Sequence, residues 1–150
     1  VRDIRIATIY EGTNGIQALD LIGRKLTLKS GAALDDYLSQ MKTILQDAEP
    51  VFPAAADGLH ALTTLQELTA ELRAAEAEAR IDAASEFLSL FGLVALSAEW
   101  ALIAKTAVAC QDQDKAFSAD KLETARFYMK RILPRYRALE TCIRAALADT

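Results

Sequence analysis

Apolar residues recur at helical spacing through most of the chain after residue 33. Between 33 and 48 they fall at intervals of four, three and four, at Leu34, Leu38, Met41 and Leu45. This spacing predicts an amphipathic helix over 33–48, ended by Pro50 and Pro53. A second helix is expected over 57–79, with inward positions at Leu59, Leu62, Leu65, Leu68 and Leu72. Its second half is rich in Ala, Glu and Arg, so we expect that half to face solvent.

The segment 82–111 is apolar on nearly every side. It has twelve uncharged residues between Phe87 and Ala98, with Glu86 and Glu99 at the edges. A helix that is apolar all round is surrounded by protein, so we expect it at the centre of a bundle or at a subunit interface. Twelve residues fall short of the ~18–20 that a membrane-spanning helix needs. The pattern therefore predicts a buried helix and no membrane span.

The last helix is expected to begin at Ser118, as its N-cap, and to run to the end of the chain. Its apolar face is formed by Tyr128 or Met129, Ile132, Tyr136, Leu139, Ile143 and Leu147. Pro134 removes one backbone donor, and we expect it to kink the helix without ending it, because the apolar pattern continues in phase.

The first 29 residues have a different organisation. Residues 1–10 fit either a strand or a helical face, and the EGTNG sequence at 11–15 predicts a turn. Thr13 is expected to cap a helix that begins near Asn14 and closes around 29–31. Its expected inner positions are Ile16, Leu19, Leu21 and Ile22. The sequence thus predicts an all-α protein with two parts, residues 1–29 and a bundle of about four long helices at 33–150.

Composition excludes several classes of function. The net charge is -4, with no run of basic residues, so nucleic acid is not an expected partner. The two cysteines, Cys110 and Cys142, lack metal-ligand spacing and are expected to be buried, reduced thiols. The lone histidine, His60, lies among leucines and predicts a boundary position with a hydrogen-bond partner, not a metal site. The chain begins at Val1 inside a patterned segment, which predicts that it is part of a longer protein.

Catalytic chemistry is expected only around Glu11. This carboxylate follows Ile9 and Tyr10 and precedes Gly12, at the turn before a helix. An apolar pocket there would raise its pKa toward that of a general base. The glycines allow close approach of a ligand, and free amides at the helix start suit phosphate oxygens. The alternative is a helix-capping acid with a turn glycine, which the residues alone favour.

The sequence RIATIYEGTNGIQ at 5–17 resembles the carboxy-terminal signature of the acyl-CoA dehydrogenase family. The similarity covers about residues 2–26. It implies that Glu11 is the general base that removes the α-proton of an acyl-CoA thioester while a bound FAD takes the β-hydride. It also implies that the backbone N–H of Glu11 donates to the thioester carbonyl, together with a flavin ribityl hydroxyl.

The same resemblance assigns roles to the neighbouring residues. Tyr10 is expected to line the acyl pocket, and Gly12 to lie against the thioester. Thr13, Asn14 and Gly15 are expected to touch the pyrophosphate and ribose end of FAD. Many family members have glutamine at the position of Gly15, so only backbone contact to FAD is implied there.

The length after the motif indicates a subtype of the family. Smaller members end soon after the helix that follows the motif, whereas this chain continues for about 120 residues. It is similar to the large subtype acting on 3-methylmercaptopropionyl-CoA and related acyl-CoAs, which has an added helical carboxy-terminal domain. The resemblance implies an electron-transfer flavoprotein as partner, a homodimer and a cytoplasmic location. The alternatives are a non-catalytic helical assembly module and part of an acyl-CoA oxidase.

Overall fold

The helices follow the apolar stripes of the sequence. The computed structural model describes residues 13–148, and all the regular elements of that part are helical, which confirms the predicted all-α class. The α-helices are α1 (Thr13–Gly23), α2 (Ala32–Ala48), α3 (Ala55–Ala74), α4 (Ala77–Asp82), α5 (Ala84–Ala109), α6 (Lys115–Phe127) and α7 (Tyr136–Ala148). Three short segments join them: the 3₁₀ segment η2 (Lys25–Gly31), the π-helical turn η3 (Tyr128–Ile132) and the 3₁₀ turn η4 (Leu133–Arg135).

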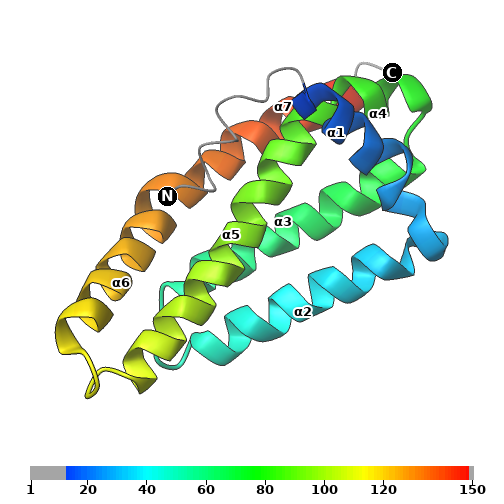
Figure 1. The fold of residues 1–150 in the computed structure, drawn as a ribbon. Coiled ribbons are helices and arrows are strands. Elements are labelled where there is room, and N and C mark those ends of the chain that lie inside the picture. The colour runs from blue at the N-terminus through cyan, green and yellow to red at the C-terminus, as the bar shows by residue number, and fades with distance from the viewer. Residues whose placement is uncertain (1–12, 149–150) are drawn as a thin grey trace.

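Helix α5 is the centre of the bundle. It packs against α1, α2, α3, α6 and α7 (Figure 1). Its largest fully buried side chains are Phe87, Leu90 and Val94. By length and composition α5 could also cross a membrane, but a core helix of a bundle passes the same test. The expected central position of the 82–111 segment is therefore confirmed.

Close approach of helices depends on Gly58 of α3. A Cβ added there would lie 2.6 Å from Cδ2 of Leu45 on α2 and 3.1 Å from the Ser97 hydroxyl on α5. Leu45 and Ser97 are themselves fully buried, so neither has open space to move into. Gly58 thus lets three helices meet at one level of the core.

Arg73 of α3 holds the entry into α2. Its guanidinium donates to the carbonyls of Leu26 and Gly31 and to the carboxylate of Asp35. Gly31 has a φ of +92°, a conformation that favours glycine, and a Cβ there would lie 2.9 Å from the Arg73 guanidinium. This contact explains why the segment between α1 and α2 is fixed although Lys29 and Ser30 also have left-handed backbones.

Two predicted helix ends are wrong. The helix expected over 57–79 ends at Ala74, and α4 begins after extended backbone at Ala75 and Glu76. No Gly or Pro marks this break, so packing of the short α4 against α5 and α7 overrides the helix propensity of the Ala- and Glu-rich sequence. The helix expected to run to about residue 29 ends at Gly23 and is followed by η2.

The predicted N-cap of the last helix is also wrong. The cap is Asp114, whose carboxylate accepts a hydrogen bond from the Phe117 backbone N–H at 3.0 Å. Ser118 lies inside α6 and is buried. The disturbance expected at Pro134 takes the form of η3 and η4, through which the chain stays helical from α6 into α7.

Polar residues also differ from some expectations. Cys110 and Cys142 are free thiols, but neither is buried as expected: Cys110 is half-buried and Cys142 is exposed on α7. His60 is exposed on α3. Among residues 13–148 no group of His, Cys, Asp and Glu side chains could hold a metal ion.

Candidate functional site

Helix α1 carries the part of the candidate site that the structure describes. Thr13, Asn14 and Gly15 form its first turn, and all three are exposed. Tyr10, Glu11 and Gly12 lie outside the described residues, so their predicted roles stay predictions. The three residues expected to contact FAD therefore lie at the amino-terminal end of α1 as the structure describes it.

One face of α1 fixes how this helix sits on the bundle. Ala18, Leu21 and Ile22 are buried on the side that packs against α5. Ile16 and Leu19, which were expected on the inner face, are instead exposed by 67% and 48%. The helical period explains the correction, because a helix anchored through 18, 21 and 22 directs positions 16 and 19 away from its support.

The first turn of α1 suits contact with an anionic group. The first four N–H groups of an α-helix have no intrahelical acceptor, and the dipole of the helix is positive at that end. A Cβ added to Gly15 would meet no atom of residues 13–148 within 4 Å. Packing within the described residues therefore does not require glycine here, and a helix end of this kind is a common binding site for anions.

The other end of α1 is held by an ion cluster. The Asp20 carboxylate accepts from Nε of Arg24 at 2.7 Å and lies 3.3 Å from Nζ of Lys25. The hydrogen bond from Arg24 is the main cause that lowers the pKa of Asp20 from 3.8 to about 2. Both partners are substantially exposed, so this cluster orients the turn into η2 more than it stabilises the fold.

The lowered pKa predicts a local dependence of stability on pH. A depressed folded-state pKa means that the contribution of Asp20 is present above about pH 4 and is lost as the pH falls toward 2. We expect Asp20→Asn to flatten the fall in melting temperature between pH 4 and pH 2. Asp36→Asn, which replaces an exposed carboxylate of α2, is the control. Parallel melting curves for the wild type and Asp20→Asn across that interval would contradict the assignment.

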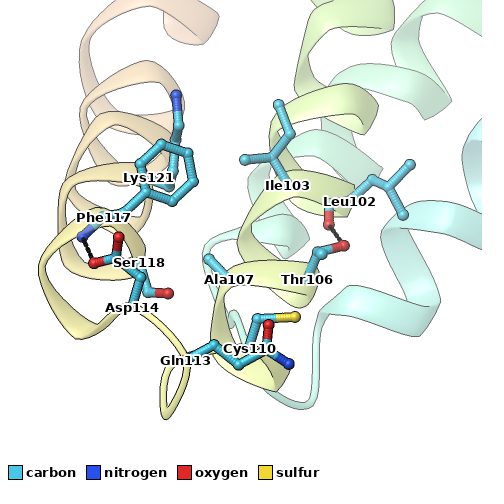
Figure 2. A pocket seen from close by; sticks show the side chains of 10 residues that line it. All are labelled: Leu102, Ile103, Thr106, Ala107, Cys110, Gln113, Asp114, Phe117, Ser118 and Lys121. Atoms are coloured by element: carbon cyan, nitrogen blue, oxygen red, sulfur yellow. Dashed lines mark hydrogen bonds between the residues drawn. The ribbon is translucent and has the colours of Figure 1, made fainter.

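Two hollows lie along opposite halves of α5. One, of about 370 Å³, adjoins α1 and is lined by Leu21, Leu34, Leu88 and the stacked rings of Tyr37 and Phe91, with Gln17 and Lys25 at its border. The other, of about 580 Å³, lies between the end of α5 and the start of α6. Figure 2 shows Ile103 of α5 on the side toward Phe117 and Lys121 of α6, with Cys110 and Gln113 near the loop, and Leu102 also lines the hollow. Neither hollow is lined by Thr13, Asn14 or Gly15.

Comparison with known proteins identifies the family. Residues 31–150 match the family model described as "Acetyl-CoA dehydrogenase C-terminal like". The chain belongs to this acyl-CoA dehydrogenase C-terminal family. Membership confirms the resemblance that the turn at Glu11 indicated, and it does so from a different part of the chain.

Two relatives extend the match of this family member toward its amino-terminal end. Both are named butyryl-CoA dehydrogenase and come from Syntrophomonas wolfei subsp. wolfei. One is 29% identical over 97% of this chain and 26% of its own length. The other is 30% identical over 89% of this chain and 24% of its own length. The chain thus spans about a quarter of the length of these relatives.

Proposed function

We propose that this acyl-CoA dehydrogenase family chain is the carboxy-terminal part of a flavin-dependent enzyme that forms the 2,3-double bond of an acyl-CoA. The observation that supports the proposal most directly is the match of residues 31–150 to the family, together with the YEGT sequence at 10–13 upstream of it. The names of the two relatives favour a short acyl chain such as butyryl. The resemblance extends the proposal to an electron-transfer flavoprotein, a homodimer and a cytoplasmic location.

In this proposal residues 10–15 have separate roles in proton removal, substrate binding and cofactor binding. Glu11 removes the α-proton, and its backbone N–H donates to the thioester oxygen, where negative charge develops. Tyr10 and Gly12 hold the acyl group and the thioester in place. FAD, when bound, accepts the β-hydride. Thr13, Asn14 and Gly15 contact its pyrophosphate end through the exposed first turn of α1.

Most of the substrate and flavin surface belongs to other parts of such an enzyme. We therefore expect the 150-residue chain alone to bind no stoichiometric FAD and to have no dehydrogenase activity. The complete enzyme should bind FAD, and anaerobic addition of butyryl-CoA should bleach the flavin absorbance. A complete enzyme whose oxidised flavin is unchanged by butyryl-CoA and by longer and branched acyl-CoAs would overturn the proposal. Rapid reoxidation of the reduced flavin by oxygen would indicate an oxidase.

Gly15 offers a test that separates folding from flavin binding. Because no atom of the described residues 13–148 is within 4 Å of an added Cβ, Gly15→Ala should stabilise the chain alone by up to ~1 kcal/mol. In the complete enzyme the same methyl group should weaken FAD retention. Gly23→Ala, at the other end of α1, also meets no atom within 4 Å and is the matched control. Equal FAD content in the Gly15→Ala and Gly23→Ala enzymes would remove Gly15 from the flavin site.

A further inference from the structure

The outward face of residues 126–137, where α6 passes into α7, has an unusual composition. Seven positions in this stretch are exposed. Five of them carry cations, and the other two are an aromatic residue and a proline: Arg126, Phe127, Lys130, Arg131, Pro134, Arg135 and Arg137. No acidic residue occurs in these twelve positions, although the whole chain has more acidic than basic residues. We refer to these seven residues as the cationic face.

The cations of this face lack the partners that cations have elsewhere in the fold. Arg73, Lys105 and Arg144 each form an ion pair with a carboxylate of another helix. Within residues 13–148, none of the five cations of the cationic face forms an ion pair, although the Arg137 guanidinium lies 5.8 Å from the centroid of the Tyr136 ring. Close spacing of these like charges costs free energy, which a bound anionic group would relieve.

The inner side of the same stretch is firmly held. Tyr128, Met129, Leu133 and Tyr136 are buried against the bundle. The Tyr128 hydroxyl donates to the Leu93 carbonyl of α5 at 2.8 Å, and burial raises the pKa of this phenol to about 12, so the donor keeps its proton. The π-helical and 3₁₀ turns are thus presented on a fixed support. Single π-helical turns inside α-helices are frequent at functional sites.

Three carboxylates lie near the cationic face, and none of them forms an ion pair with its cations. Lys130 and Arg137 border a hollow of about 250 Å³ with His60 and Asp57 of α3. Asp57 is the one carboxylate that lines this hollow, and it pairs with neither cation. On the α6 side, Glu123 lies one turn before Arg126 and, with Asp120, borders a hollow at Phe127. Neither carboxylate forms an ion pair with Arg126 or with any other cation of the face.

We propose that the cationic face is a docking surface for an acidic region of a partner protein. Four of its five cations are arginines. A planar guanidinium can donate two parallel N–H hydrogen bonds to one carboxylate, which a lysine ammonium cannot do. Phe127, 58% exposed and next to Arg126 at the start of the stretch, is of the residue class that anchors protein interfaces. The face extends along twelve residues from α6 through η3 and η4 into α7, so it suits an extended acidic surface. This inference does not depend on the role of Glu11.

A binding experiment on the 150-residue chain tests the proposal with a short fluorescein-labelled poly-L-glutamate peptide. Fluorescence anisotropy at low ionic strength gives the Kd of the wild type. We expect the triple variant Arg126→Gln, Arg131→Gln, Arg135→Gln to raise this Kd about tenfold, the sum of three exposed ion pairs. A triple Arg→Lys variant at the same positions should lose part of the affinity, because the positive charge is kept but the bidentate hydrogen bonds of the guanidinium groups are lost.

The matched control removes the same charge from other exposed or half-exposed cations that form no ion pair. Lys42→Gln, Arg80→Gln, Lys115→Gln should change the Kd by less than about twofold, because these side chains lie on three separate helices. Thermal melting verifies that each variant is folded. Equal losses in both glutamine triples would overturn the proposal, as would full affinity in the lysine triple. Binding to phosphatidylserine vesicles without binding to polyglutamate would also overturn it, in favour of a membrane surface.

Discussion

Replacing Phe87 with alanine is expected to lower the free energy of unfolding by about 3–5 kcal/mol. The side chain is fully buried in α5, the helix that packs against most of the others. Its ring lies 6.3 Å from that of Phe91 at a tilt of 60°, so the substitution removes an aromatic contact as well as apolar area. A domain of this size has a total stability of about 5–15 kcal/mol, so the loss is a large part of it.

Phe127 provides a control with the same chemical change. It is 58% exposed on α6, and its replacement by alanine should cost less than about 1 kcal/mol. Urea denaturation of the two variants, followed by circular dichroism, gives both values. Similar losses for Phe87→Ala and Phe127→Ala would show that α5 is not the centre of the stable core. The same result would contradict the arrangement in which the other helices pack around α5.

The core could be predicted because the helical spacing of apolar residues indicates directly which side chains are buried. Leu34, Leu38, Met41 and Leu45 are all buried, as their spacing indicated. The segment around Phe87 lacked a polar face, and its helix packs against the other six α-helices of the described residues. In these segments one face or every face was apolar, so no competing arrangement could bury the same side chains.

Helix ends could not be predicted with the same success, because several residues satisfy the same local rule. Ser118 and Asp114 are both good N-caps ahead of an amphipathic segment, and only the structure shows that the Asp114 carboxylate binds the Phe117 N–H. The break after Ala74 has no sequence signal at all. It depends on where α5 and α7 require α4 to lie, which is a property of the whole bundle.

The candidate site was predicted from a motif, and its surroundings were missed for a physical reason. Ile16 and Leu19 were expected to face inward because apolar residues usually do, but α1 packs through a different set of positions. The cationic face does not appear in the sequence as a contiguous run of basic residues. Exposed cations on a helix gather at spacings of three and four, so Arg126, Lys130 and Arg131 are separated by the buried Tyr128 and Met129.

Glu11→Gln in the complete enzyme is expected to have the largest effect on activity, a loss of about 10²–10⁴-fold in kcat. Glutamine has nearly the shape of glutamate but cannot accept the α-proton. The backbone N–H that is proposed to bind the thioester oxygen is unchanged by this substitution. A group that acts only in the transition state lowers kcat and leaves KM nearly constant, so the two constants should separate. FAD content should stay that of the wild type.

Exchange of the substrate α-proton tests the role of Glu11 apart from hydride transfer. In deuterated water the wild-type enzyme should incorporate deuterium at the α-carbon of a bound acyl-CoA, and Glu11→Gln should do so far more slowly. Glu78→Gln, an exposed carboxylate on α4, controls for the loss of one charge. Because only the base takes the α-proton, near-normal exchange and turnover in Glu11→Gln would assign the proton to another group. Glu11 would then be the helix-capping acid that the residues alone favour.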